Sequence, residues 1–249
     1  MLRQTKDDRT LRENLMLASS TAFVSGVINV AGMVAFLAFT SNITGHVANL
    51  ANNFVQRNFR EVAVFMLWLL MFFLGAFTAN FIIRSLEHKS IYRAHATPVI
   101  LEIVILLTVA VYGHHFYDED QLERELIIGA LLFAIGLQNS LVSIISGGLI
   151  KSSHLTGLFT DLGGEVSEWL HPRTGKNPVV KNKILIRITI LTFYFIGGVF
   201  GGFFFDRYDY LIFYFIPLIL LTILYYDLRP IALHRLDRLL WGTNKRKTS

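Results

Sequence analysis

The chain has 249 residues, of which 53% are hydrophobic and 16% are charged, and it contains no cysteine. This composition excludes an ordinary soluble domain and predicts a polytopic membrane protein, while the missing thiols exclude disulfides and cysteine chemistry. The net charge of +5 does not indicate a nucleic-acid partner, because the basic residues lie between apolar segments and not among stacking aromatics.

Six apolar stretches approach or reach the length of about 20 residues that a helix needs to cross a bilayer. They follow a charged N-terminal tail, residues 1–14, which lacks the features of a cleavable signal peptide. We expect an all-α polytopic fold with spans at residues 15–39, 62–83, 97–116, 126–150, 184–205 and 210–228. Residues 229–249 are expected to form a cytoplasmic tail with an amphipathic helix and a basic end.

The basic residues predict the orientation of these spans, because Lys and Arg gather on the cytoplasmic side of a membrane. Tails and connections on one side contain four, three, five and six of them, whereas the other side contains two, one and one. We therefore expect both termini to be cytoplasmic.

A short polar phrase occurs twice, Thr-Ser-Asn-Ile-Thr-Gly-His at residues 40–46 and Ser-Ser-His-Leu-Thr-Gly-Leu at residues 152–158. Upstream, Gly-Val-Ile-Asn at 26–29 is matched by Gly-Leu-Gln-Asn at 136–139. The chain therefore reads as two copies of one three-span unit, residues 15–116 and 126–228. An odd number of spans per copy makes the repeat inverted, an arrangement found in many secondary transporters.

The segments after the two phrases, Gly45 to Gln56 and Gly157 to Leu170, are too short to span a membrane. We interpret them as re-entrant or broken half-helices whose starts lie inside the protein, since lipid does not satisfy free backbone amides. Glycine is expected to permit the turn there, and Thr or Ser to cap the exposed amides. Small residues four apart in the second and fifth spans indicate close packing of helices within the chain.

Polar side chains in and near the phrases form the candidate substrate site. The amides of the first span in each copy either line a solute path or bond helix to helix, and their recurrence in both copies favours the path. The candidate substrate-binding residues are Asn29, Ser41, Thr44, Gly45, Asn49, Gln138, Asn139, Ser153, Thr156, Gly157 and Thr160.

Asp161 and His154 are the candidates for binding a coupling proton or cation, and their counterparts in the first copy are the neutral Asn49 and Asn42. An acidic residue at membrane depth is a functional candidate by default, and histidine titrates near neutral pH. The alternative roles are a helix-capping carboxylate and a structural imidazole. Two other charges within spans, Glu102 and Arg187, are expected to reach the interface or to pair locally.

Three phrases, at residues 39–45, 136–140 and 154–163, resemble signature phrases of the YoaK family of uncharacterised bacterial inner-membrane proteins. The resemblance extends over nearly the whole chain and implies a six-span protein of the bacterial inner membrane, without implying an activity. Asn29 stands where that family often has an acidic residue, so proton coupling through this position is not expected.

Together these features predict a secondary transporter or facilitator of a small polar solute, which binds near the midplane between the two Thr-Gly breaks. The expected partners are the lipid bilayer, the solute and, for coupled transport, a proton or cation. No catalytic residue, metal, cofactor or nucleic acid is expected. The alternatives are an intramembrane enzyme acting on a lipid or small molecule, assembled from Ser153, His154 and Asp161, and a non-transporting sensor or partner subunit.

Overall fold

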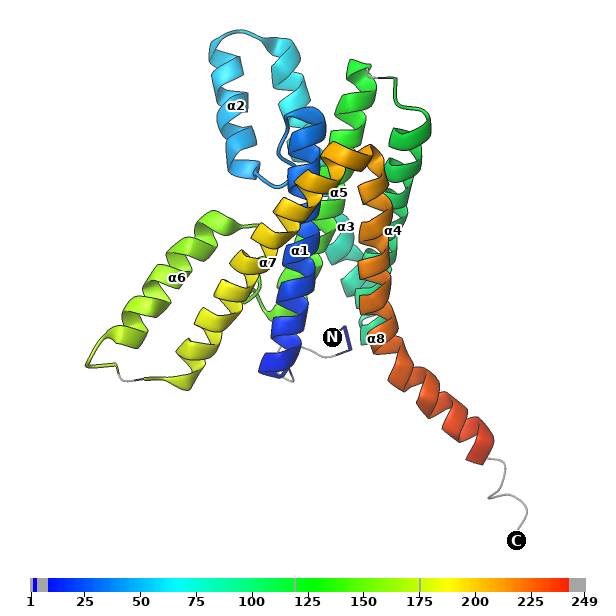
Figure 1. Ribbon diagram of the computed structural model, residues 1–249. Helices are drawn as coiled ribbons and strands as arrows, with labels where there is room; N and C mark the ends of the chain where they lie inside the picture. The colour runs from blue at the N-terminus through cyan, green and yellow to red at the C-terminus, as the bar shows by residue number, and fades with distance from the viewer. Residues whose placement is uncertain (1, 4–8, 119, 175, 242–249) are drawn as a thin grey trace.

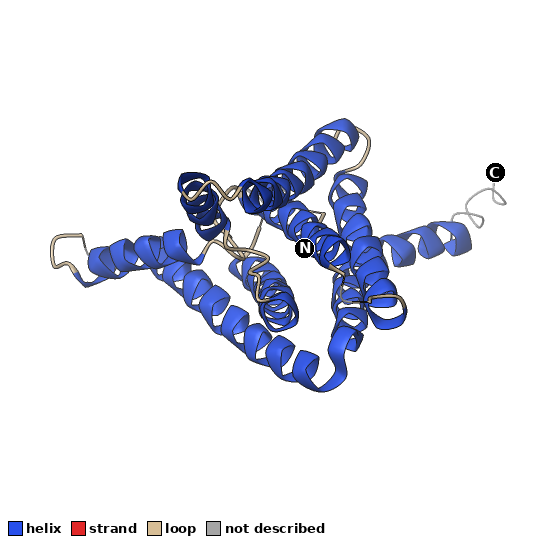
Figure 2. Cartoon of the chain, turned by 90° about the horizontal axis from the view of Figure 1, so that it is seen from above, coloured by secondary structure: helices blue, strands red, loops and turns tan. Residues whose placement is uncertain are grey.

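The computed structural model describes residues 2–3, 9–118, 120–174 and 176–241, with the backbone alone for 229–241. Every regular element in these ranges is a helix (Figure 2), which confirms the all-α prediction. The basic end of the expected tail, residues 242–249, lies outside the described residues. In chain order the helices are α1 (Leu11–Phe36), α2 (Ile43–Val55), α3 (Phe59–Leu86), α4 (Ile91–His115), α5 (Gln121–Ser146), α6 (Leu155–Leu170), α7 (Pro178–Tyr208), the 3-10 turn η2 (Asp209–Leu211) and α8 (Ile212–Trp241).

Capping residues in the polar flanks set where the long helices begin. Thr10 starts α1 through a capping box, in which its hydroxyl accepts from the Glu13 N–H at 3.3 Å and the Glu13 carboxylate accepts from the Thr10 N–H at 2.9 Å. Side chains at residues 58, 90, 120 and 177 cap α3, α4, α5 and α7 in the same position. These helices therefore begin several residues before the apolar spans that hydropathy predicts, whereas α1 and α5 end before the predicted spans do.

The helices α1 and α5 end in the same way. Leu37 follows α1 with a φ of 54°, and Gly147 follows α5 with a φ of 62°, so both residues are in the left-handed region. Glycine adopts this conformation without a steric penalty, whereas another residue pays about 1–2 kcal/mol. In each case the chain then turns back toward the middle of the molecule and enters a short helix (Figure 1).

Among the most extensive helix contacts is that between α1 and α7, where glycines bring the two backbones together. A Cβ added to Gly26 would lie 2.2 Å from the carbonyl oxygen of Tyr194. A Cβ added to Gly197 would likewise lie 2.2 Å from the carbonyl oxygen of Phe23. These distances leave no room for any side chain, so glycine is required on both sides of the crossing.

The contact between α3 and α5 repeats this design with different residues. A Cβ on Gly75 would lie 2.1 Å from the carbonyl oxygen of Phe133, and one on Gly136 would lie 2.3 Å from that of Phe72. The first helix of each half therefore packs against the long helix that follows the short helix of the other half. The small-residue spacing serves packing within the chain.

The two short helices run in opposite directions. Figure 1 shows that α2 and α6 both begin near the middle of the molecule and extend toward its two opposite ends. Each then forms a hairpin with the next long helix, α2 with α3 and α6 with α7. The loops at residues 37–42 and 147–154, called here the first break and the second break, therefore both lie at mid-height.

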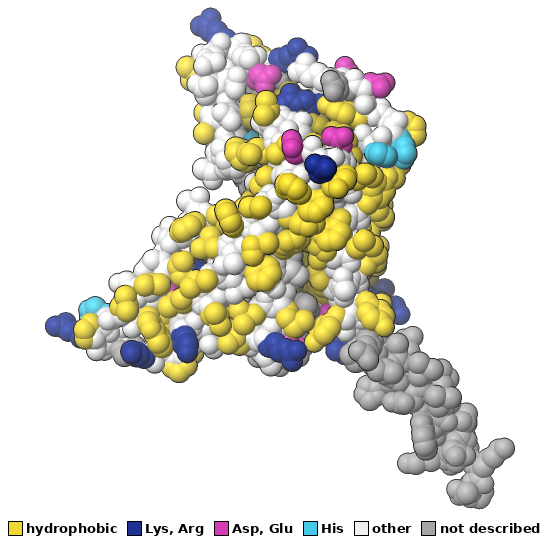
Figure 3. Space-filling view, viewed as in Figure 1, with side chains coloured by type: hydrophobic (Ala, Val, Ile, Leu, Met, Phe, Trp, Pro, Cys, Tyr) yellow, Lys and Arg dark blue, Asp and Glu magenta, His cyan; other side chains and the backbone are white. Residues whose placement is uncertain are grey.

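The surface of the bundle is suited to lipid. Five segments of the described chain are long and apolar enough to cross a membrane, and the last of them, Pro178–Leu228, includes α7, η2 and the first part of α8. Phe73, Phe77 and Phe81 are exposed along one face of α3. Figure 3 shows hydrophobic side chains over the middle of one face and charged side chains toward its ends. Such a continuous apolar belt is typical of a multi-pass membrane protein.

One buried carboxyl differs from expectation. Glu102, on α4, is 1% exposed, and its Oε1 atom has no hydrogen-bond partner. The prediction that this side chain reaches the interface or pairs locally is therefore wrong. The helix places it against the packed interior, on the side of α4 that carries the buried residues Val99 and Leu106.

Candidate functional site

The two breaks contribute to a single central cavity of about 530 Å³. Its lining comes from both breaks, from the first turns of α2 and α6, and from one residue each on α1 and α7. Of the predicted site residues it brings together Asn29, Ser41, Thr44, Ser153, His154, Thr156 and Gly157. Two stretches separated by 112 positions in the sequence thus lie around one space of the size that a small molecule occupies.

Asn29 and Asn139 hold the two breaks in place. The Asn29 Oδ1 atom accepts from the backbone N–H of Ser41 at 3.0 Å. Asn139 donates to the hydroxyl of Ser153 at 2.6 Å and accepts from that of Ser152 at 3.0 Å. Asn139 does not line the cavity and both ends of its amide are occupied, so in this conformation it anchors the second break.

Gln138 serves another contact. Its Nε2 atom donates to the carbonyl of Thr21 and to the hydroxyl of Ser25, both at 2.8 Å, and thereby joins α5 to α1. Gln138 is 2% exposed and lies outside the central cavity. This geometry fits the alternative in which the Gln138 amide bonds one helix to another and does not line a solute path.

The first turns of the short helices differ from the expected design. Gly45 and Gly157 lie inside α2 and α6, and neither has a positive φ. The expectation that they permit the turn is wrong, because the residues with positive φ in the two breaks are Leu37, Gly147 and Gly148. The expected Thr or Ser cap is also absent from both helices: Asn42 caps α2 by accepting from the Gly45 N–H at 3.0 Å, and α6 has no side-chain cap.

The glycines instead provide space. A Cβ on Gly157 would meet nothing within 4 Å, so this position keeps the wall of the central cavity open. A Cβ on Gly45 would lie 2.4 Å from the side chain of Asn42, so glycine there makes room for the cap.

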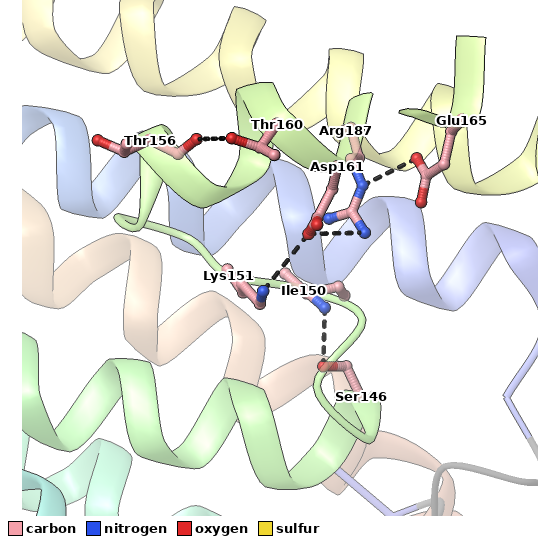
Figure 4. A network of polar contacts seen from close by, with 8 residues as sticks. All are labelled: Ser146, Ile150, Lys151, Thr156, Thr160, Asp161, Glu165 and Arg187. Atoms are coloured by element: carbon pink, nitrogen blue, oxygen red, sulfur yellow. Dashed lines mark hydrogen bonds and ion pairs between the residues drawn. The ribbon is translucent and has the colours of Figure 1, made fainter. Parts of the chain in front are cut away.

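Asp161 lies in a cluster of four charged side chains (Figure 4). Its Oδ2 atom is 3.4 Å from Lys151 Nζ and 3.2 Å from Arg187 Nη2. The Nε atom of Arg187 also donates to Glu165 at 2.8 Å, and this buried pairing confirms that Arg187 pairs locally. The cluster joins the second break and α6 to α7, and Asp161 itself does not line the cavity.

The other predicted residues are distributed around these features. Thr160 is exposed on α6 and donates to the carbonyl of Thr156 at 3.2 Å. His154 faces the central cavity, and within the described chain no hydrogen bond joins it to Ser153 or to Asp161. Among the described residues, the structure therefore shows no hydrogen bond for the expected proton relay or between the three residues of the enzyme alternative.

Gly45 and Asn49 line a second, smaller cavity of about 290 Å³ between α2, α3 and α5. This outer cavity shares Phe39 and Asn42 with the central cavity, so these two residues separate the two spaces. Its walls include the carboxyl of Glu125, which is 7% exposed, and a packed aromatic group formed by His46, Phe65 and Trp68.

A third hollow, of about 630 Å³, adjoins the central cavity on the outer surface of α1, α6 and α7. It shares Leu155 and Tyr194 with the central cavity, and the rest of its lining is apolar. Phe195 and Val199 are exposed along it. Because it has almost no polar groups to orient a solute, we assign this groove to lipid contact.

Two residues that line the central cavity are absent from the predicted site. Tyr194, on α7, places its hydroxyl 3.2 Å from that of Ser41, and Lys151 lines the central cavity. Lys151 directly precedes the second phrase in the sequence, where a lysine also fits the role of an orientation charge. Tyr194 gives no such signal, because tyrosine is common in membrane spans.

A family model described as "Protein of unknown function (DUF1275)" matches residues 17–226 of the chain. No curated protein and no solved structure shows significant similarity to it. The matched region contains both breaks and every residue that lines the central cavity. The chain therefore belongs to the DUF1275 family.

Proposed function

We propose that the protein is a secondary transporter or facilitator of a small polar solute that binds in the central cavity. The observation that carries this proposal is that both breaks, one from each half, line the same cavity. Short helices that begin inside the protein and face a common cavity are the usual construction of a transporter substrate site.

The proposed architecture is a three-plus-three inverted repeat of six spans with two half-helices, in which α7 and α8 are separate spans. Matched features in the two halves support it. The contact of α1 with α7 has its counterpart in that of α5 with α3. Leu37 corresponds to Gly147 at the ends of α1 and α5, and Asn29 corresponds to Asn139 as the anchor of a break.

In the proposed orientation both termini are cytoplasmic and the protein lies in the inner membrane of a bacterium. The distribution of Lys and Arg supports the orientation, because most basic residues outside the tails lie around the connection from α3 to α4, around that from α6 to α7, and at the start of α7. The likeness of three phrases to those of the YoaK family supports the location in the bacterial inner membrane.

The two sides of the cavity differ in a way that suits alternating access. Toward the proposed outside, the central cavity adjoins the outer cavity at Phe39 and Asn42, which line both. Toward the proposed cytoplasm, the ion pairs of Lys151, Asp161 and Arg187 fasten the second break to α7. Opening of the inner side requires these ion pairs to rearrange, and this makes Asp161 a group whose pairing changes during transport.

The proposal is tested in proteoliposomes by measuring how fast vesicles re-swell after osmotic shrinkage in a panel of small polar solutes. Thr156 lines the cavity and is exposed to it, so Thr156→Trp is expected to block it without disturbing the fold. Thr160→Trp is the matched control, because Thr160 is one turn further along α6, exposed, and outside the cavity lining.

At least one solute is expected to enter faster with the wild type and the control than with Thr156→Trp. If no solute enters faster with the wild type than in protein-free vesicles, the transport proposal is wrong.

A further inference from the structure

We infer that the central cavity binds a small organic anion and that Lys151 is the residue that neutralises it. This inference rests on the proposed function and adds the class of the solute.

Lys151 is the one formally charged side chain among the described residues that line the central cavity. No carboxylate is present in that lining, since Asp161 and Glu165 face α7 and the glutamates of the outer cavity lie beyond Phe39. A cationic solute would therefore find no opposite charge at this site. An anion would find one, in a partly buried space where a charge pair is stronger than in water.

Lys151 is available to bind a solute, because its partner Asp161 also forms an ion pair with Arg187. The Lys151–Asp161 pair is long, at 3.4 Å, and 40% of the lysine side chain is exposed. Arg187 approaches the same carboxylate oxygen to 3.2 Å, and its side chain is only 8% exposed. When Lys151 turns to a solute, Asp161 keeps the charge of Arg187 beside it, so no carboxylate is left unpaired.

The neutral groups around Lys151 also suit an anion with a small apolar part. The hydroxyls of Thr44 and Thr156 line the cavity and are donors. Beside them, Phe39 and Leu155 provide apolar surface. A carboxylate on a short carbon chain matches this combination better than an inorganic ion does, because an inorganic ion would leave the apolar wall without a partner.

The test measures the thermal unfolding of the purified full-length protein in detergent, in sodium acetate, lactate or succinate against sodium chloride of the same ionic strength. Glycerol and ethanolammonium chloride are the neutral and cationic probes. The variants are Lys151→Gln, Lys151→Arg and Asp161→Asn, and the matched control is Lys183→Gln, which removes an exposed lysine on α7 outside the cavity.

At least one organic anion is expected to raise the Tm of the wild type, of Lys183→Gln and of Lys151→Arg. Lys151→Gln is expected to need about tenfold to a hundredfold more anion for the same shift, as expected for loss of a charged hydrogen bond. Asp161→Asn separates the pairing of Lys151 with Asp161 from the binding of the anion by Lys151. It frees Lys151 and is expected to keep or strengthen the response to the anion.

The inference is overturned if Lys151→Gln responds like the wild type, if Asp161→Asn loses the response as Lys151→Gln does, or if no organic anion shifts the wild type. Flux of a neutral or cationic solute that Thr156→Trp blocks would then leave the transport proposal standing without the anion. Conversely, anion binding without flux of any solute would contradict the transport proposal, while the anion-binding site would stand.

Discussion

The hydroxyl of Ser41, in the first break, lies 3.2 Å from the hydroxyl of Tyr194, on α7. Ser41 is also fixed to α1, because its backbone N–H donates to the Oδ1 atom of Asn29 at 3.0 Å. The break of the first half is therefore fastened to a helix of each half. A movement of α7 relative to α1 would act directly on the wall of the central cavity.

Tyr194→Phe removes this hydroxyl contact and keeps the ring. We expect a loss of about 1 kcal/mol in the free energy of unfolding, the usual value for one neutral hydrogen bond, and a changed rate of solute entry. Re-swelling assays and thermal unfolding check both effects. Tyr225→Phe is the control, because Tyr225 is 65% exposed on α8 and far from the breaks in sequence; equal rates for the two variants would contradict a role for the Ser41 contact.

Leu37→Gly is expected to stabilise the protein. Leu37 has a φ of 54° and is 88% exposed, so its side chain contributes little packing while its backbone is strained. Relief of this strain is worth about 1 kcal/mol. The reciprocal change, Gly147→Ala, introduces the same strain after α5 and is expected to lower the Tm. A lower Tm for Leu37→Gly would show that the left-handed turn is not a source of strain.

Gly197→Ala is expected to disrupt the crossing of α1 and α7, because its Cβ would lie 2.2 Å from the carbonyl oxygen of Phe23. Gly75→Ala should act equally on α3 and α5, where the clash with Phe133 is at 2.1 Å. We expect a destabilisation of about 3 kcal/mol or more for each, typical of severe overpacking. Size-exclusion profiles and thermal unfolding measure it.

Gly157→Ala is the control for both glycine variants, since its Cβ has open space and the residue lies in a helix. It should fold at least as stably as the wild type. An unaffected Gly197→Ala would show that the two helices are not held at this distance.

Glu102→Leu is expected to keep or raise the stability. The carboxyl of Glu102 is buried with one oxygen lacking a partner, and an unpartnered polar group in an apolar interior costs about 1–3 kcal/mol. Thermal unfolding of Glu102→Leu and Glu102→Gln checks this. A large loss of stability in both variants would reveal a contact that depends on the acid.

The sequence was sufficient for the all-α class of the fold and for the expectation that the two phrases lie around one space, because apolar length and repeated phrases indicate both. The spans around Asn29 and Asn139 and the short helices that contain Thr44 and Thr156 follow from such patterns. The roles of single residues did not follow from the sequence. Asp161 has the appearance of an isolated acid in the sequence, and only the folded hairpin of α6 and α7 brings Arg187 to it from 26 positions away.

The turns were also beyond sequence reasoning. The phrases predict a turn at Gly45 and Gly157. The backbone reverses its direction earlier in the chain, at Leu37 in the first break and at Gly147 and Gly148 in the second. Leucine carries no turn signal, so the first of these positions could be found only by aligning it with glycine in the second half. The adjacency of the two cavities at Phe39 and Asn42 depends on the folded shape of the chain, which no local pattern encodes.

Alternating access requires the one cavity between the two breaks to open in turn to both sides of the membrane. Because the chain has no cysteine, Thr156→Cys gives a single thiol in that cavity. Asn58→Cys, between α2 and α3, and Lys176→Cys, between α6 and α7, are the single-thiol controls for the two proposed sides.

The measurement is the reaction of Thr156→Cys with a membrane-impermeant thiol reagent in right-side-out and in inside-out vesicles. We predict that position 156 reacts in both, while position 58 reacts only in right-side-out and position 176 only in inside-out vesicles. Reaction of position 156 from one side alone, in every solute of the panel, would contradict alternating access.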